Sequence, residues 1–187
     1  MDERKWIERI LAGDTQSFSC LVAKYEKMAY TIALRILENR EEAEEAVQDA
    51  FVKMYRALSD FHFDSKFSTW FYRIVYRTAL TDLRQQRMFV SYEEAGPVDL
   101  SNDEVESATA VLEREDRKEM IARTLKKLPA DEALLLTLYY LEECSVEEIC
   151  QITELSASNV KVKLFRGRKR FYEVLQDKMK LETADLL

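Results

Sequence analysis

Apolar residues along this chain recur three and four positions apart, which is the spacing that lines one face of an α-helix. Asp14 is a suitable N-cap for a long stretch of this kind, which extends from Phe18 to Leu37. A shorter stretch at residues 6–11 precedes it. These patterns predict a short leading helix followed by a long amphipathic helix.

The same spacing continues in the next part of the chain. Asn39, with Glu42 three residues later as in a capping box, can open a second long helix. Residues 59–68 interrupt the pattern and indicate a loop, and residues 66–87 resume it. We therefore expect residues 14–88 to form one compact helical unit.

Helical spacing returns in the last third of the chain. Pro129 separates two apolar stripes, and Ser145 with Glu148 makes a further capping box. A short turn leads to a final basic helix, for which either Ser156 or Ser158 is a suitable cap. No stretch shows the alternation of apolar and polar residues that is expected of a strand. The prediction is an all-α fold.

Residues 89–115 separate the two helical patterns and are rich in acids. The stretch 91–116 holds nine acidic residues and one basic residue, so its local charge is −8, whereas the whole chain has a formal net charge of −7. The rest of the chain is therefore near +1, and residues 161–180 hold eight bases and two acids. We expect an acidic linker joining a domain at 1–88 to a domain at 116–187.

Composition excludes several classes of chemistry. Cys20, Cys144 and Cys150 are scattered, which argues against a disulfide framework and against zinc. His62 is the only histidine of the 187 residues. We therefore expect no metal, no cofactor and no catalytic site. The N-terminus is too charged for a secretory signal, and no apolar run could span a bilayer, so we expect a cytoplasmic protein.

Residues 145–172 have the elements of a helix-turn-helix: a short helix, a tight turn and a basic second helix. Asparagine, lysine and arginine on such a helix can contact base edges and neutralise phosphates. The simpler alternative is a solvated basic face. The side chains expected to point outward are Asn159, Lys161, Lys163, Arg166, Arg168 and Lys169.

The helix predicted at residues 66–87 combines aromatic residues with arginines. Arg73, Arg77 and Arg84 fall within about 40° of arc at helical spacing, and Trp70 lies between them and the apolar stripe. Such a surface can hold a nucleic-acid backbone and stack on unpaired bases. The alternative is that the aromatics are core, which we favour for Phe71. The preceding loop could form a pocket for an extruded base with Phe61, Phe63 and Phe67.

Acidic residues cluster at positions 41–49. Such a cluster could hold Mg²⁺ in a nuclease, but acids in a first helical turn more commonly complement the helix dipole. A face for a protein partner is the better interpretation.

Three of these segments occur in the order found in a known family. They are AEEAVQDAFVKMYRAL, FDSKFSTWFYRIVYRTALTDLRQQR and, beyond the linker, LPADEALLLTLYYLEECSVEEICQITELSASNVKVKLFRGRKRF. Over nearly its whole length the chain resembles a bacterial RNA polymerase sigma factor of the extracytoplasmic-function (ECF) class. The resemblance implies two small helical domains joined by an acidic linker, and a protein that is not an enzyme. It would bind core RNA polymerase, direct it to specific promoters and help to melt DNA for transcription initiation.

The resemblance also implies roles for individual residues. Domain 1–88 would be sigma region 2, which binds polymerase and recognises the −10 element, and domain 116–187 would be region 4, which reads the −35 element. The residues expected at the clamp coiled coil of the largest polymerase subunit are Glu45, Gln48 and Asp49. Those expected at the −10 element are Phe63, Lys66, Trp70, Arg73, Arg77, Arg84 and Arg87. Those expected at the −35 element are Ser156, Ser158, Asn159, Lys161, Lys163, Arg166 and Arg168.

Further partners follow from the same resemblance. Region 4 would sit on the polymerase flap, the linker would thread toward the active-site and RNA-exit channels, and an anti-sigma factor, often membrane-anchored, would hold the protein inactive. Two positions depart from the family pattern: Arg77 stands where asparagine is common, and Glu154 stands where the turn usually carries glycine. Since a residue with a Cβ disfavours positive φ, we expect an altered turn or a Glu154 outside the left-handed region.

One alternative function stays open at this point. A helix-turn-helix transcription regulator could act without polymerase as its obligate partner, and would bind a symmetric duplex operator. The arginine–aromatic helix argues against it, because a dimerisation or sensor domain does not need that surface.

Overall fold

The computed structural model describes residues 3–90 and 112–184, and helices account for most of both ranges. The first range contains α1 (Glu3–Leu11), α2 (Thr15–Leu37), α3 (Arg40–Arg56), the short 3-10 helix η1 (Leu58–Asp60) and α4 (Phe67–Val90). The second contains α5 (Leu112–Lys126), α6 (Ala130–Tyr140), α7 (Val146–Thr153) and α8 (Ala157–Ala184). None of the residues in these two ranges forms a strand, which confirms the all-α prediction.

The helices begin where the sequence places capping residues. The Asp14 side chain accepts a hydrogen bond from the Gln16 N–H at 3.0 Å, and Asn39 accepts one from Glu41 at 2.9 Å. Ser145 and Glu148 form the reciprocal capping box that opens α7. Ser156, not Ser158, caps α8 by accepting from the Asn159 N–H at 3.3 Å. These bonds satisfy backbone donors that a helix leaves unpaired at its first turn.

The N-terminal unit is built around α4. Helices α2, α3 and α4 pack on one another, and α1 packs against α2. Phe71 is fully buried and its ring lies 4.7 Å from that of Phe51, with Tyr25 at 6.0 Å. Phe67 is buried in the same aromatic cluster. Phe71 and Phe67 are therefore core residues, as expected for Phe71 from the sequence.

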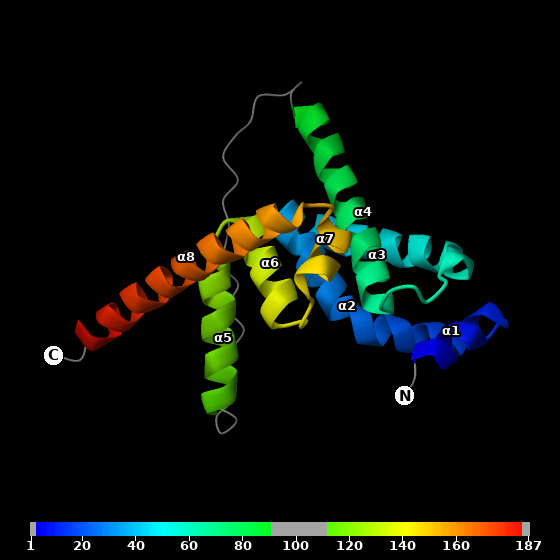
Figure 1. Ribbon diagram of the computed structural model, residues 1–187, viewed down its shortest axis with the longest axis horizontal. Coiled ribbons are helices and arrows are strands. Elements are labelled where there is room, and N and C mark those ends of the chain that lie inside the picture. The colour runs from blue at the N-terminus through cyan, green and yellow to red at the C-terminus, as the bar shows by residue number, and fades with distance from the viewer. Residues whose placement is uncertain (1–2, 91–111, 185–187) are drawn as a thin grey trace.

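The C-terminal unit packs α8 against α5, α6 and α7. Gly167 allows the close approach of α8 to α6: a Cβ there would lie 3.2 Å from Leu136 Cδ1 and 3.3 Å from Glu132 Cβ. In Figure 1, α8 extends from this contact as a long helix toward the C-terminus.

The two units pack together rather than standing apart. Helix α7 lies against α4, and α6 lies against α2 (Figure 1). The buried apolar residues of both units form one continuous cluster. Helix occupies both ends of the segment expected as a linker, since α4 continues to Val90 and α5 begins at Leu112. The remainder of that segment, 91–111, lies outside the described residues.

The described helices offer no candidate for a bilayer span, because none is both long and apolar enough.

The α6–α7 loop buries a thiol at the junction of the two units. Cys144 is 6% exposed, and its N–H donates to the Leu138 carbonyl at 3.0 Å. Burial, together with the negative charges of Glu148 and Glu142, raises the pKa of Cys144 to about 11. Cys20, by contrast, is exposed on α2.

We expect iodoacetamide at pH 8 to alkylate Cys144 at least about 100-fold more slowly than Cys20, because the thiolate is the nucleophile and each pKa unit removes about tenfold of it. Peptide mass spectrometry over time gives both rates in one sample. Similar rates at the two cysteines would show that the α6–α7 loop does not pack as described.

Candidate nucleic-acid and polymerase interfaces

Helix α4 presents the arginine stripe on the side away from its core face. Arg77 and Arg84 are exposed and Arg73 is partly exposed, while Phe71, Tyr72 and Val75 are buried. Among the described residues, Arg73 and Arg84 take part in no ion pair. The side chain of Arg87 lies outside the described part of α4. The structure thus brings three of the four candidate arginines onto one accessible face.

Trp70 lies between that face and the core. Its ring is partly buried, at 5.1 Å from the Phe61 ring and 5.6 Å from the Phe67 ring. Phe61, from the loop before α4, and Phe67, the first residue of α4, therefore pack against the indole and leave part of it accessible.

A small pocket opens beside this aromatic cluster. It has a volume of about 260 Å³, and its residues come from α1, the loop before α4 and the start of α4. They are Glu3, Arg4, Ile7, Phe61, Phe63, Ser65, Lys66 and Phe67. Since a base needs an aromatic wall and polar groups at its edge, this composition suits an unstacked base.

The sequence predicts the loop side of this pocket but not the side that α1 supplies. The predicted phenylalanine loop supplies Phe63, which lies at φ 61, a backbone conformation that bulky residues rarely adopt. The Arg4 guanidinium lies 4.2 Å from the Phe63 ring centroid. Glu3, Arg4 and Ile7 were not expected in this pocket, because nothing in the sequence pattern of α1 shows that this helix packs against the loop.

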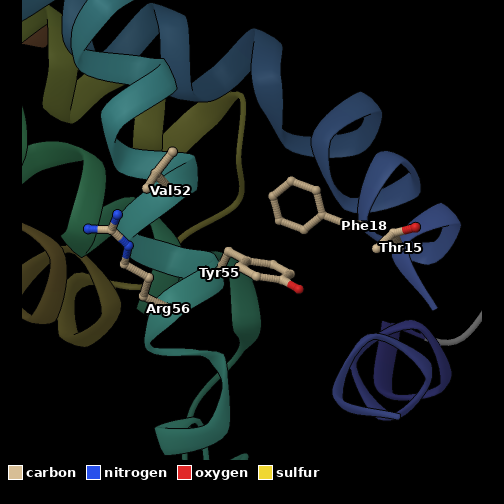
Figure 2. Close-up of a pocket in the computed structure, with 5 residues that line it drawn as sticks. All are labelled: Thr15, Phe18, Val52, Tyr55 and Arg56. Atoms are coloured by element: carbon tan, nitrogen blue, oxygen red, sulfur yellow. The ribbon is translucent and has the colours of Figure 1, made fainter. Parts of the chain in front are cut away.

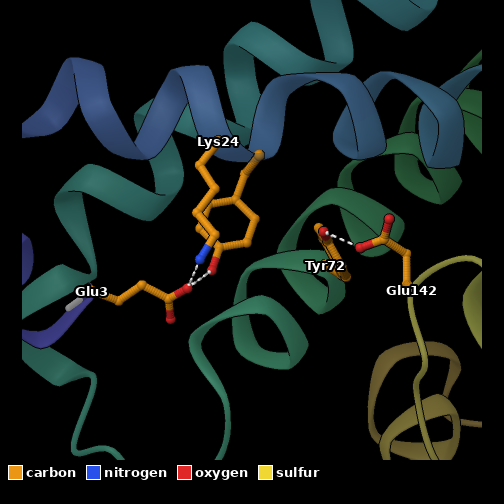
Figure 3. A network of polar contacts seen from close by, with 5 residues as sticks. Glu3, Lys24, Tyr72 and Glu142 are labelled. Atoms are coloured by element: carbon orange, nitrogen blue, oxygen red, sulfur yellow. Dashed lines mark hydrogen bonds and ion pairs between the residues drawn. The ribbon is translucent and has the colours of Figure 1, made fainter. Parts of the chain in front are cut away.

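Several polar contacts join α4 and the loop before it to the C-terminal unit. Lys66 Nζ lies 3.0 Å from Glu148 Oε1. Figure 3 shows the contact of Tyr72 with Glu142, in which the Tyr72 hydroxyl donates to Glu142 Oε2 at 2.9 Å. Arg77 Nε donates to Glu154 Oε1 at 2.9 Å, and a second guanidinium nitrogen contacts the same oxygen. Residues far apart in sequence are thus paired across the junction of the two units.

The electrostatics of the junction agree with these contacts. The hydrogen bond to Glu148 raises the pKa of Lys66. Burial acts to raise the pKa of Glu148, but hydrogen bonds from Ser145 and Lys66 outweigh it and lower that pKa. Burial, with the charge of Glu142, raises the pKa of Tyr72. Lys66 and Glu148 are therefore both charged, and Tyr72 is neutral, throughout the neutral pH range.

Glu154 corrects one expectation from the sequence. It ends α7 in the left-handed conformation, at φ 62 and ψ 15, and its N–H donates to the Cys150 carbonyl at 2.8 Å. The turn is therefore the one that a glycine would make, and Glu154 does not avoid the left-handed region. Its side chain gains the contact with Arg77, which a glycine could not make.

The outward face of α8 combines bases with exposed apolar side chains. Four of the residues expected at the −35 element are exposed there: Asn159, Lys161, Arg166 and Arg168. Ser156 and Ser158 are exposed at the start of the helix. Phe165 is 65% exposed on the same helix. Phe165 was not among the residues expected at DNA, although an aromatic one turn from Lys161 is at the spacing of a shared face.

Two bases of α8 pair with acids of α6. Lys163 forms an ion pair with Asp131, and Arg170 Nη1 lies 3.0 Å from the buried Glu132. Both acids lie in the first turn of α6. The structure therefore places Lys163 on a different side of α8 from Lys161.

Helix α3 carries the residues expected at the polymerase. Glu45, Gln48 and Asp49 are exposed, and Asp49 lies 3.7 Å from Lys53 one turn later. In the part of the chain that the structure describes, no group of three or more acids, histidines or cysteines could hold a metal ion. The exposed acidic face of α3 is a candidate surface for a protein partner.

An apolar groove adjoins this acidic face. Its volume is about 440 Å³, and it lies between the start of α2 and the last turns of α3 (Figure 2). Thr15, Phe18, Val52, Tyr55 and Arg56 line it. Phe18 and Tyr55 meet edge to face at 5.1 Å. An exposed aromatic groove beside acidic residues is typical of a protein-binding surface.

Comparison with known proteins assigns both units. Residues 21–88 match the model of Sigma-70 region 2, and residues 118–171 match that of Sigma-70, region 4. The chain is 32% identical over 181 residues to the RNA polymerase sigma-H factor of Pseudomonas aeruginosa, covering 93% of this chain and 94% of that protein. It is 30% identical over 170 residues to the ECF RNA polymerase sigma-E factor of Escherichia coli, covering 87% and 88%.

Solved structures share the fold. A co-crystal structure of the sigma factor RpoE with the anti-sigma factor NepR from Bartonella quintana has a TM-score of 0.69 at 18% identity, covering 87% of this chain and 98% of that chain. The structure of CnrH with the cytosolic domain of CnrY has a TM-score of 0.61 at 21% identity, covering 94% and 97%. With two sigma regions in order and relatives matched along nearly their whole length, this chain belongs to the ECF class of RNA polymerase sigma factors.

Proposed function

We propose that this sigma factor binds core RNA polymerase through α3, reads a −35 element with α8 and melts a −10 element at α4 and its preceding loop. The observation that carries the proposal is the division of surfaces: an acidic face with an apolar groove, a basic face with exposed aromatics, and an arginine stripe beside a base-sized pocket. It acts as an initiation factor without chemistry of its own, in the cytoplasm with the polymerase.

Promoter melting is assigned to the N-terminal unit. An unpaired base enters the pocket of about 260 Å³ against Phe63, and Lys66 neutralises a neighbouring phosphate. Trp70 stacks at the end of the duplex, while Arg73 and Arg84 follow the backbone of the single strand. Arg4 completes the pocket wall through its contact with Phe63.

Duplex recognition is assigned to the C-terminal unit, domain 116–187. The exposed side of α8 enters the major groove, where Asn159 and Lys161 reach base edges near the helix start. Arg166 and Arg168 contact phosphates. Phe165 makes an apolar contact with a thymine methyl group. Lys163 supports α8 through its pair with Asp131.

The polymerase contact is assigned to α3. Glu45, Gln48 and Asp49 face the clamp coiled coil of the largest subunit, and the adjoining groove at Val52 and Tyr55 receives an apolar side chain from it. Region 4 sits on the flap, and segment 89–115 is the acidic linker between the domains. Two modest DNA surfaces on one polymerase then act as one site, because the first contact raises the effective concentration of the second.

An anti-sigma factor is proposed as the negative regulator. The support is the likeness in fold to sigma factors solved with the anti-sigma partners NepR and CnrY. A membrane anchor on this partner would link it to a signal outside the cytoplasm.

A reconstituted run-off assay tests the function. With core polymerase, the protein should direct transcripts from discrete start sites on a promoter found by mapping starts after overexpression. Alone, it should bind duplex promoter DNA weakly, since its basic surfaces are split and small. Transcripts from no defined start with active core polymerase would contradict the proposal. Tight binding to a symmetric duplex without polymerase would instead support a helix-turn-helix regulator.

Trp70→Ala should impair open-complex formation while leaving polymerase binding unchanged, because a base–aromatic stack contributes about 1–3 kcal/mol. Permanganate footprinting measures melting, and competition for core polymerase measures binding. Trp6→Ala is the matched control, since Trp6 is also a partly buried tryptophan but lies on α1 outside the pocket. Loss of polymerase binding in the Trp70→Ala variant would instead show that Trp70 has a structural role.

Asp49→Lys should weaken binding to core polymerase by about tenfold, because it reverses a charge at the proposed interface. Competition against a labelled sigma factor measures the change. Glu26→Lys makes the same charge reversal at an exposed position on α2 and should have little effect. If the Asp49→Lys variant and the native protein bind core polymerase with equal affinity, Asp49 does not contribute to the interface.

A further inference from the structure

We propose that two acids at the start of α6, Asp131 and Glu132, are positioning residues for recognition of the −35 element. They set the rotation of α8 about its own axis by holding Lys163 and Arg170 of that helix. The inference rests on the proposed function, since it requires that α8 read duplex DNA. It gives Lys163 a role inside the protein in place of a contact with a phosphate.

The Asp131 carboxylate uses its two oxygens for two different helices. Oδ1 accepts a hydrogen bond from the Glu132 N–H at 2.9 Å in the first turn of α6, where Pro129 supplies no side-chain cap. Oδ2 forms the ion pair with Lys163 of α8. Burial acts to raise the pKa of Asp131, but hydrogen bonds and the charge of Lys163 outweigh it and lower that pKa. The pair is therefore charged at neutral pH and ties α8 to the N-terminus of α6.

The second pair is anchored in the interior of the C-terminal unit. Glu132 is 5% exposed, and its Oε1 lies 3.0 Å from Arg170 Nη1. Its Oε2 is also buried and has no hydrogen-bond partner among the residues that the structure describes. A buried carboxylate that loses its cation is strongly destabilising. Glu132 therefore favours the rotation of α8 that brings Arg170 to it.

Gly167 lies between these two bases and lets α8 approach α6 closely. A Cβ at position 167 would lie 3.2 Å from Leu136 Cδ1 and 3.3 Å from Glu132 Cβ. Lys163, Gly167 and Arg170 follow one another at intervals of four and three residues, so they share one face of the helix. The acids of α6 thus hold α8 at two points about two turns apart, on either side of the contact at Gly167.

This face lies nearly opposite the side of α8 that is available to DNA. At about 100° per residue, the mean direction of Lys161, Phe165 and Arg168 is about 160° from that of the three residues that face α6. Lys161, Phe165 and Arg168 are all exposed. Rotation of α8 by about 30° would displace atoms at its surface by about 3 Å, the length of a hydrogen bond to a base edge. Base readout therefore depends on the rotation that the two pairs fix.

Positioning and simple electrostatics predict opposite effects of removing Asp131. Its side chain is 52% exposed beside a basic helix, so an acid that merely opposes phosphates would weaken binding to every DNA sequence alike. Removing such an acid would tighten binding. If Asp131 positions α8, its removal weakens binding to the specific sequence, because phosphate contacts carry little sequence information and base contacts carry most of it.

The test uses holoenzyme assembled from core polymerase and the full chain. One template carries a promoter mapped in the run-off assay, and the other carries the same promoter with its −35 element scrambled. The ratio of the holoenzyme concentrations that give half-maximal transcription on the two templates measures −35 specificity. Asp131→Asn removes the charge and keeps the oxygen that caps α6. The matched control is Glu173→Gln, since this exposed acid pairs with Lys169 within α8 and does not contact α6.

Asp131→Asn should lower the specificity ratio about three- to tenfold, through weaker binding to the mapped promoter, and Glu173→Gln should leave it unchanged. Equal ratios for the native, Asp131→Asn and Glu173→Gln holoenzymes would overturn the inference. Tighter binding of the Asp131→Asn holoenzyme to both templates would overturn it as well, because Asp131 would then act on DNA by charge alone.

A second variant separates positioning from stability. Glu132→Leu with Arg170→Met replaces the buried ion pair by apolar side chains, an exchange that is often neutral or stabilising. The melting temperature of the full chain should stay within about 2 °C of the native value or rise. The specificity ratio should nevertheless fall about three- to tenfold. A native ratio in this variant would overturn the positioning role of Glu132, since the pair would then serve stability only.

The two templates also separate this inference from the function on which it rests. If the native holoenzyme starts equally well on both templates, α8 does not read the −35 element, and the duplex recognition proposed for the C-terminal unit is rejected. If the native ratio exceeds about tenfold and Asp131→Asn preserves it, the positioning role alone is rejected.

Discussion

Burial of the apolar face of α4 is the interaction on which the rest of the structure depends. Phe71 and Val75 are inaccessible to solvent, and α4 packs against α2 and α3 on one side and α7 on another. Because an α-helix has 3.6 residues per turn, fixing this face also fixes the direction of Arg73, Arg77 and Arg84. The same packing that stabilises the N-terminal unit therefore positions its candidate DNA surface.

Much of this arrangement could be predicted because it depends on neighbours in the sequence. Caps at Asp14, Asn39 and Ser145, and the separation of Phe71 from the arginine stripe, follow from local hydrogen bonds and helical periodicity. The junction of the units could not be predicted this way. Arg77 and Glu154 are 77 residues apart, and no local pattern records which of many exposed charges will meet.

The fold also divides the basic residues of α8 into two groups, those that pair with acids of α6 and those that do not. Lys163 and Arg170 belong to the basic run, yet both pair with acids of the first turn of α6. These pairs instead fix the rotation of α8, so that Lys161 and Phe165 lie on its exposed side. Composition counts all bases equally, whereas only the fold distinguishes bases that orient a helix from bases that can release counterions from DNA.

The left-handed Glu154 has a consequence for how this protein can change over evolution. A side chain in that conformation costs about 1–2 kcal/mol relative to glycine, so a glutamate-to-glycine mutation, which needs one nucleotide change, would relax the backbone. The same mutation would remove the partner of Arg77. Backbone stability and the contact between the two units thus favour opposite residues at one position, and retention of the strained residue is the outcome expected where the contact is under selection.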